Sequence, residues 1–90
     1  MKIVITQEDV KNAGNYINPT DCPLAKVMKK ELNRDDIFVG SYSIGITNPN
    51  NRIITKIGEI NPPFEAMDHN NLKFGGIKEF VTEYTPNEKL

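Results

Sequence analysis

The middle of the chain alternates between apolar and polar residues, and this pattern leaves few folds open. Residues 37–47 (IFVGSYSIGIT) and 52–60 (RIITKIGEI) are rich in β-branched side chains, and the Asn-Pro-Asn-Asn sequence between them favours a turn. Two such segments predict a β-hairpin. Pro62 and Pro63 end its second strand, because proline cannot donate to a β-ladder. The side chains expected on one face of the first strand are those of Phe38, Tyr42, Ile44 and Ile46.

The N-terminal residues predict a strand followed by a short helix. Residues 2–6 (KIVIT) are mostly β-branched, which favours a strand. Thr6 and Asp9 have the spacing of a helix cap, in which a side chain accepts a hydrogen bond from a backbone N–H that has no helical partner. The helix is expected to run through Ala13 and to end at Gly14, because glycine readily adopts the left-handed conformation found at helix ends.

Two longer helices are expected, one before the hairpin and one after it. The first begins near Asp21-Cys22-Pro23, because proline is favoured in a first helical turn, and ends at Asn33. Its apolar stripe consists of Leu24, Val27, Met28 and Leu32. The second helix is expected over residues 77–84 and ends before Pro86. Its apolar stripe consists of Ile77, Phe80, Val81 and Tyr84.

These elements predict one α+β domain over residues 1–90. An antiparallel sheet, made of the N-terminal strand and the central hairpin, is packed by the two main helices. The 11 isoleucines outnumber the 4 leucines, and β-branched residues favour strands over helices. A chain of 90 residues has no room for a separate cofactor domain. Residues 64–74 are ambiguous, because FEAM favours one helical turn whereas DHNN is typical of a loop.

The charge and the cysteine content of the chain indicate which classes of partner and which cellular compartment are favoured. The 11 basic and 12 acidic residues give a net charge of -1, which favours neither nucleic-acid binding nor mimicry of DNA. The single cysteine, Cys22, cannot form an internal disulfide, which indicates a reducing compartment. There is no apolar run long enough for a membrane span, and the first residues lack the apolar segment of a signal peptide. We therefore expect a cytoplasmic protein that binds neither membranes nor nucleic acid.

Cys22 and His69 are the two residues considered for a catalytic role, as a reactive thiol and as a base. A thiol at a helix N-terminus has a lowered pKa, and the neighbouring Asp21 has the opposite effect. For Cys22 we favour a structural role, as a small buried residue that caps the helix, over a reactive thiol. His69 is the only histidine and is expected in a polar loop, where only Asp68 could orient it. We assign no catalytic residue, and the spacings indicate neither a metal site nor a cofactor.

Four residues are the candidates for a binding surface. Phe38 and Tyr42 in the hairpin have no Arg or Lys interleaved with them, which is typical of core or interface residues rather than of base-stacking ones. Lys26 and Lys30 belong to the one basic cluster of the chain. Because Glu31 lies beside this cluster, a solvated helix face is the simpler interpretation.

Several short motifs follow one another along most of the chain. TQEDV follows the first strand, Cys22-Pro23-Leu24-Ala25 begins a helix, FVGSYSI forms a Val-Gly strand, and KEFVTEYTPNEKL closes the chain. In this order the chain resembles a family of small, largely uncharacterised proteins encoded by bacteriophages and prophages. The resemblance implies an accessory protein that acts inside the host cytoplasm, and it brings no catalytic residue with it.

The leading hypothesis is a non-enzymatic accessory protein that binds a host or phage protein. One alternative is a virion component or self-assembling subunit, in which a neighbouring copy completes an exposed sheet edge. A second is a small thiol enzyme that uses Cys22. A third is nucleic-acid binding through the basic cluster, which would weaken steeply with salt.

Overall fold

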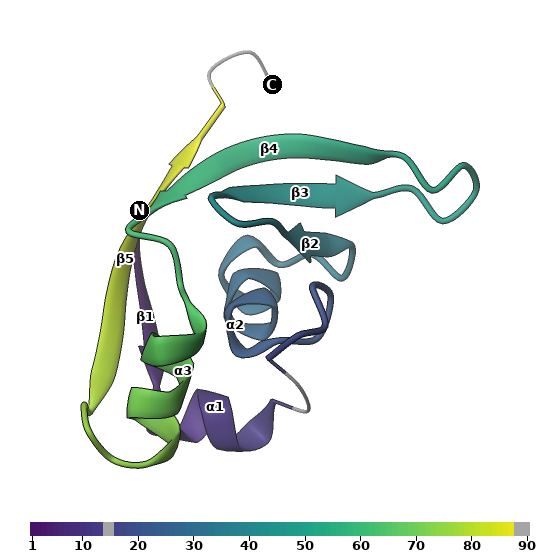
Figure 1. Cartoon of the computed structure of the whole chain (residues 1–90). Helices are drawn as coiled ribbons and strands as arrows, with labels where there is room; N and C mark the ends of the chain where they lie inside the picture. Colours follow the sequence, from purple (N-terminus) through teal and green to yellow (C-terminus); the bar gives the residue numbers. More distant parts are fainter. Residues whose placement is uncertain (14–15, 88–90) are drawn as a thin grey trace.

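Five strands form one antiparallel sheet in the order β1-β5-β4-β3-β2, and three helices pack against it in this computed structural model (Figure 1), which describes residues 1–13 and 16–87. The α+β fold class predicted from the sequence is confirmed. The elements, in chain order, are β1 (Lys2–Thr6), α1 (Gln7–Asn12), α2 (Pro23–Leu32), β2 (Ile37–Val39), β3 (Ser43–Thr47), β4 (Ile54–Asn61), α3 (Ala66–Lys73) and β5 (Glu79–Pro86).

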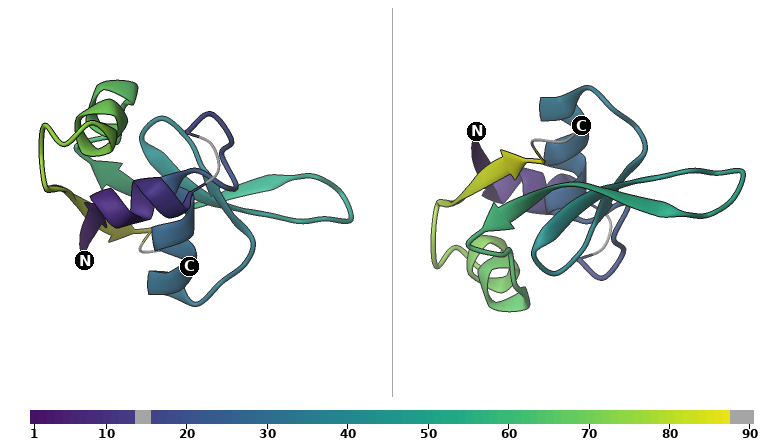
Figure 2. Two further views of the ribbon diagram at one scale, coloured as in Figure 1. Left: turned by 90° about the horizontal axis from the view of Figure 1, so that it is seen from below. Right: turned by 90° about the horizontal axis from the view of Figure 1, so that it is seen from above.

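The sheet curls so that its two halves run in different directions. Figure 1 shows β1 and β5 running across the direction of β3 and β4, with α2 in the angle between them. Both further views show α1 between α2 and α3 (Figure 2), and α1 contacts both of these helices. The fully buried side chains come from both halves of the sheet and from two helices, and they include Ile3, Ile5, Leu24, Met28, Ile37, Ile44 and Leu72.

The helix boundaries with local sequence signals are confirmed. The Thr6 hydroxyl accepts a hydrogen bond from the Asp9 N–H (3.2 Å), and the Thr6 N–H donates to the Asp9 carboxylate (2.8 Å). α2 begins at Pro23 and is followed by Asn33, which adopts the left-handed conformation at φ 52°. The predicted end of the first helix at Gly14 lies outside the described residues.

The central hairpin is confirmed as β3 and β4, but the predicted first strand is divided. Residues 40–42 form a turn, and β2 folds back onto β3 so that Phe38 lies opposite Gly45 and Val39 opposite Ile44. Opposed residues share a face, so Phe38 points to the face opposite Ile44 and Ile46. The prediction that Phe38 shares a face with these isoleucines was therefore wrong, and Tyr42 lies in the turn rather than in a strand.

The predicted C-terminal helix over residues 77–84 is also wrong, because these residues enter β5. Its Val81 pairs with Val4 of β1, and its Tyr84 pairs with Ile60 of β4, so β5 lies inside the sheet. The alternate residues Thr82 and Tyr84 are buried, whereas Val81 is exposed. The second main helix is instead α3, in the segment that the sequence left ambiguous. The tail after Asn87 lies outside the described residues.

Candidate functional site

A groove with a volume of about 960 Å³ lies between α1 and α3. It exists because α1 and α3 lie side by side at the end of the curled sheet where β1 runs into α1. The helices contribute Gln7, Val10, Lys11, His69, Leu72 and Lys73 to its lining. One side of the groove is open to solvent, so it is a cleft rather than an enclosed cavity.

The floor of the groove is apolar and its walls carry aromatic rings. Val10 and Leu72 are buried core residues at the floor. The rings of Tyr16 and His69 lie 5.1 Å apart between centroids, and both pack against Phe64 beneath them at 6.1 and 6.4 Å. Phe74 also lines the groove, and 78% of its surface is exposed to solvent. An exposed aromatic beside an apolar cleft is typical of a binding surface.

The charged side chains among the described lining of the groove are basic. Lys11 of α1 and Lys73 of α3 line it from opposite helices, and no carboxylate is among the described residues that line it. Lys73 also places its ammonium 5.5 Å from the centre of the Phe74 ring. Burial raises the pKa of the Tyr16 phenol, and the charges of Cys22, Glu65 and Asp68 raise it further, so Tyr16 is a neutral hydroxyl at physiological pH.

The sequence did not point to this groove. Its residues come from positions 7–17 and 66–75, and no motif links the two segments. His69 was expected in a solvated loop but lies within α3, where its ring faces Tyr16. The one available signal was Phe74, a large apolar residue between Lys73 and Gly75 in an otherwise polar segment.

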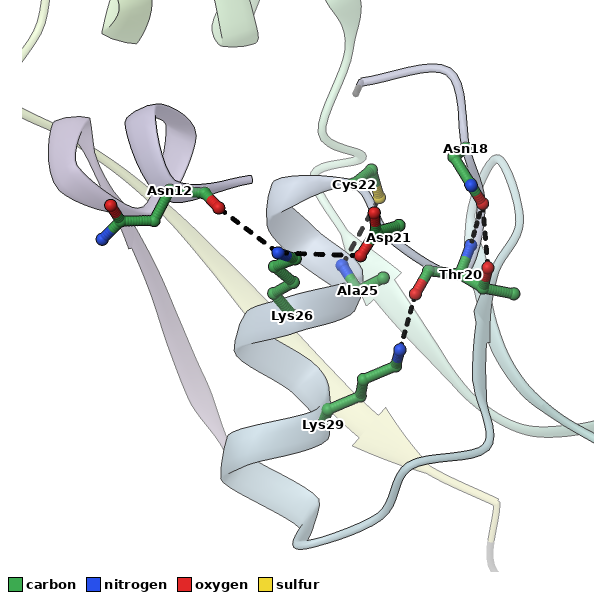
Figure 3. Close-up of polar contacts among 8 residues, drawn as sticks. All are labelled: Asn12, Asn18, Thr20, Asp21, Cys22, Ala25, Lys26 and Lys29. Carbon is green, nitrogen blue, oxygen red and sulfur yellow. Dashed lines mark hydrogen bonds and ion pairs between the residues drawn. The ribbon is translucent and has the colours of Figure 1, made fainter. Parts of the chain in front are cut away.

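Cys22 caps α2 with its sulfur, as Figure 3 shows. The Sγ atom accepts a hydrogen bond from the Ala25 N–H at 3.4 Å, and the residue is 5% exposed. Burial raises the pKa of the Cys22 thiol, and this outweighs the backbone N–H groups at the helix start, which lower it. The helix end was expected to favour the thiolate, but desolvation of the site has the larger effect. The geometry is that of a packed cap residue.

We therefore expect the thiol of Cys22 to be protected in the folded protein. A disulfide reagent such as dithionitrobenzoate should react with the native chain more than about tenfold more slowly than with the urea-unfolded chain, because attack requires an exposed thiolate. The absorbance of the released thiolate measures both rates, and Cys22→Ser provides the blank. Equal rates for the folded and unfolded chain would contradict the buried cap.

The other predicted binding residues do not meet at one site. Phe38 lines a second, smaller hollow of about 390 Å³, which Tyr16 also lines, and Tyr42 is exposed in the turn after β2. Lys26 forms an ion pair with Asp21 (3.6 Å) and donates to the Asn12 carbonyl (3.3 Å), as Figure 3 shows. Lys26 and Lys30 share a trough beside β1, and Phe38 is not among the residues that line it.

Comparison with protein-family models, with curated proteins and with solved structures finds no match for this chain. Within residues 1–13 and 16–87, no three His, Cys, Asp or Glu side chains gather closely enough to hold a metal ion. In the same part of the chain, every helix is too short or too polar to cross a bilayer. The function is therefore inferred from the geometry of the groove.

Proposed function

We propose that this chain is a non-enzymatic accessory protein, of phage or prophage origin as its motifs imply, that binds a host or phage protein in the cytoplasm through the α1–α3 groove. The supporting observation is the combination of the Val10 and Leu72 floor, the exposed ring of Phe74 and the two lysines on facing walls. Aromatic anchors beside an apolar cleft are the usual centres of protein–protein recognition.

The partner that fits this groove is an amphipathic helix with acidic residues beside its apolar stripe. Such a helix places its apolar side chains on the floor, between two helices that already form walls. Its carboxylates then lie near Lys11 and Lys73, and no acidic side chain of the described lining opposes them. A small molecule would be held less completely, because pockets for small ligands enclose most of the ligand surface and this cleft is open.

Reversing either charge in the groove is expected to weaken this binding. Lys11→Glu and Lys73→Glu should each weaken the affinity about tenfold, because an attraction of roughly 1 kcal/mol becomes a repulsion. The measurement is fluorescence anisotropy of a library of labelled amphipathic helical peptides, half with glutamate and half with lysine beside the same apolar stripe. Only the glutamate peptides should bind the wild-type chain.

Arg52→Glu is the matched control, because Arg52 is exposed in the segment between β3 and β4, which Figure 1 shows away from α1 and α3. It changes the net charge by the same amount as each groove variant and should leave the affinity unchanged. The double variant K11E/K73E should prefer the lysine peptides. Equal binding of both peptide sets, or equal effects of Arg52→Glu and Lys73→Glu, would show that the groove is not the recognition site.

A further inference from the structure

The sheet has two edges, and the described residues cover only one of them. At the β2 edge, the Val39 N–H donates to the Pro19 carbonyl at 2.8 Å, so the loop before α2 covers that short strand. At the other end, β1 pairs with β5 on one side and has no strand on its other side among the described residues. An uncovered edge presents free backbone groups to another strand.

The register identifies which backbone groups are free. The Tyr84 N–H donates to the Met1 carbonyl (2.8 Å), and the Met1 amino group donates to the Tyr84 carbonyl (2.9 Å). Backbone bonds alternate along an antiparallel pair, so Ile3 and Ile5 also bond to β5, whereas Lys2 and Val4 point their N–H and C=O groups to the open side. The chain itself uses the next outward N–H, that of Thr6, in its bond to Asp9.

A trough of about 250 Å³ runs beside this free edge, with α2 as its other wall. Val4 and Val27 provide its apolar part. Its charged residues are two acids and two bases, namely Asp9, Glu31, Lys26 and Lys30. The side chains of Lys30 and Glu31 are both exposed, and neither takes part in an ion pair within the described chain.

We propose that a second copy of this chain adds to the β1 edge, with β1 antiparallel to β1 about a two-fold axis at Ile3. In this register Lys2 lies opposite Val4 of the partner subunit, and Val4 lies opposite Lys2 of the partner subunit. Four backbone hydrogen bonds form, and they use every free N–H and C=O group of these two residues in both copies.

The balance of charge beside the edge favours a second copy over a different strand. A two-fold axis places a surface against itself, and a surface with equal numbers of acids and bases is then complementary to itself. Lys30 can meet Glu31 of the partner subunit, because both α2 helices lie on the same face of the joined sheet. A purely acidic or purely basic strand would meet repulsion from one half of the trough.

The dimer leaves the groove open in each copy. Along α1, Gln7, Val10 and Lys11 line the groove, whereas Asp9 lines the trough on the opposite side of the helix. Dimerisation and binding in the groove are therefore independent, and either one can fail without the other. A dimer presents two grooves, so it would bind a partner with two acidic helices more tightly than a monomer does.

Sedimentation equilibrium over a concentration series tests the proposal. The mass should rise from 10.2 kDa to twice that value as the concentration rises. Val4→Pro should remove the dimer, because proline removes an N–H that the monomer does not use and is tolerated on edge strands. Arg52→Glu should dimerise like the wild type. In the wild type, amide exchange at Val4 should slow with rising concentration, while exchange at Ile3 is slow throughout.

Charge variants provide a second test that does not depend on proline. Lys30→Glu should weaken the dimer several-fold, and adding Glu31→Lys should restore it, because the double variant is again self-complementary. A mass of 10.2 kDa at every concentration, with a native circular dichroism spectrum, overturns the proposal. A dimer in which exchange at Val4 does not change also overturns it, because the contact then lies elsewhere. If Val4→Pro fails to fold, the wild-type exchange and the Lys30 variants decide.

Discussion

Gly58→Ala is expected to lower the free energy of unfolding by about 3 kcal/mol, the upper end of the usual cost of overpacking. A Cβ atom at this position would lie 2.5 Å from Cε1 of Tyr84 and 2.7 Å from the carbonyl oxygen of Thr85. The first contact is with a buried ring and the second with the backbone of β5, the strand next to β4. Urea denaturation, followed by circular dichroism, measures the loss.

The backbone contact makes this effect hard to relieve. Trimming Tyr84 in a Gly58→Ala chain would remove the ring, but the Thr85 carbonyl would still be 2.7 Å from the new methyl group. Gly76→Ala is the matched control, because its nearest contact is the side chain of Asn71 at 3.3 Å on an exposed segment. It should cost less than about 1 kcal/mol. Similar losses at both glycines would show that β4 and β5 can separate at little cost.

Two overlapping periodicities explain why the C-terminal segment was misassigned. Phe80, Val81 and Tyr84 recur at helical spacing, but Phe80, Thr82 and Tyr84 also alternate as in a strand. A run of eight residues fits both periods, and periodicity alone cannot separate them. The strand forms because β1 and β4 both offer free edges to this segment, and these contacts are distant in the sequence.

Boundaries set by neighbouring residues were predictable, whereas those set by distant contacts were not. The Thr6 cap, the start of α2 at Pro23 and its end at Asn33 each depend on residues within one helical turn. α3 has no comparable apolar stripe, because Leu72 is its only buried residue. A hydrogen bond from the Glu65 N–H to the Asp68 carboxylate (3.1 Å) stabilises its first turn, but the surrounding asparagines conceal this in the sequence.

The candidate groove was unpredictable for the same physical reason. It requires that α1 and α3 lie together, and this follows from the position of β5 between β1 and β4. In the predicted structure, with a helix over residues 77–84, different residues would pack against α1, and Lys73 and Phe74 would lie in a loop. Lys11 and Lys73 lie 62 positions apart in the sequence, so only the fold shows that they line the same groove and make it basic.

Phe64 connects the stability of the fold to this groove, and Phe64→Ala is expected to cost about 3 to 4 kcal/mol. Its buried ring contacts Tyr16, His69 and Phe80, the last at 5.1 Å between ring centres. Alanine would leave a cavity beneath both aromatic walls of the groove. Urea denaturation measures the cost, and peptide binding is measured under conditions in which the variant is still folded.

Binding should fall with Phe64→Ala even in the folded population, because Tyr16 and His69 lose the surface that holds their rings in place. Phe64→Leu is the control, since it keeps most of the buried volume at a cost of about 1 kcal/mol and should keep most of the affinity. If the folded alanine variant bound acidic peptides as tightly as the wild type, the rings would not shape the site. Recognition would then rest on Phe74 and the two lysines, and the groove would act as an electrostatic surface rather than as a fitted cleft.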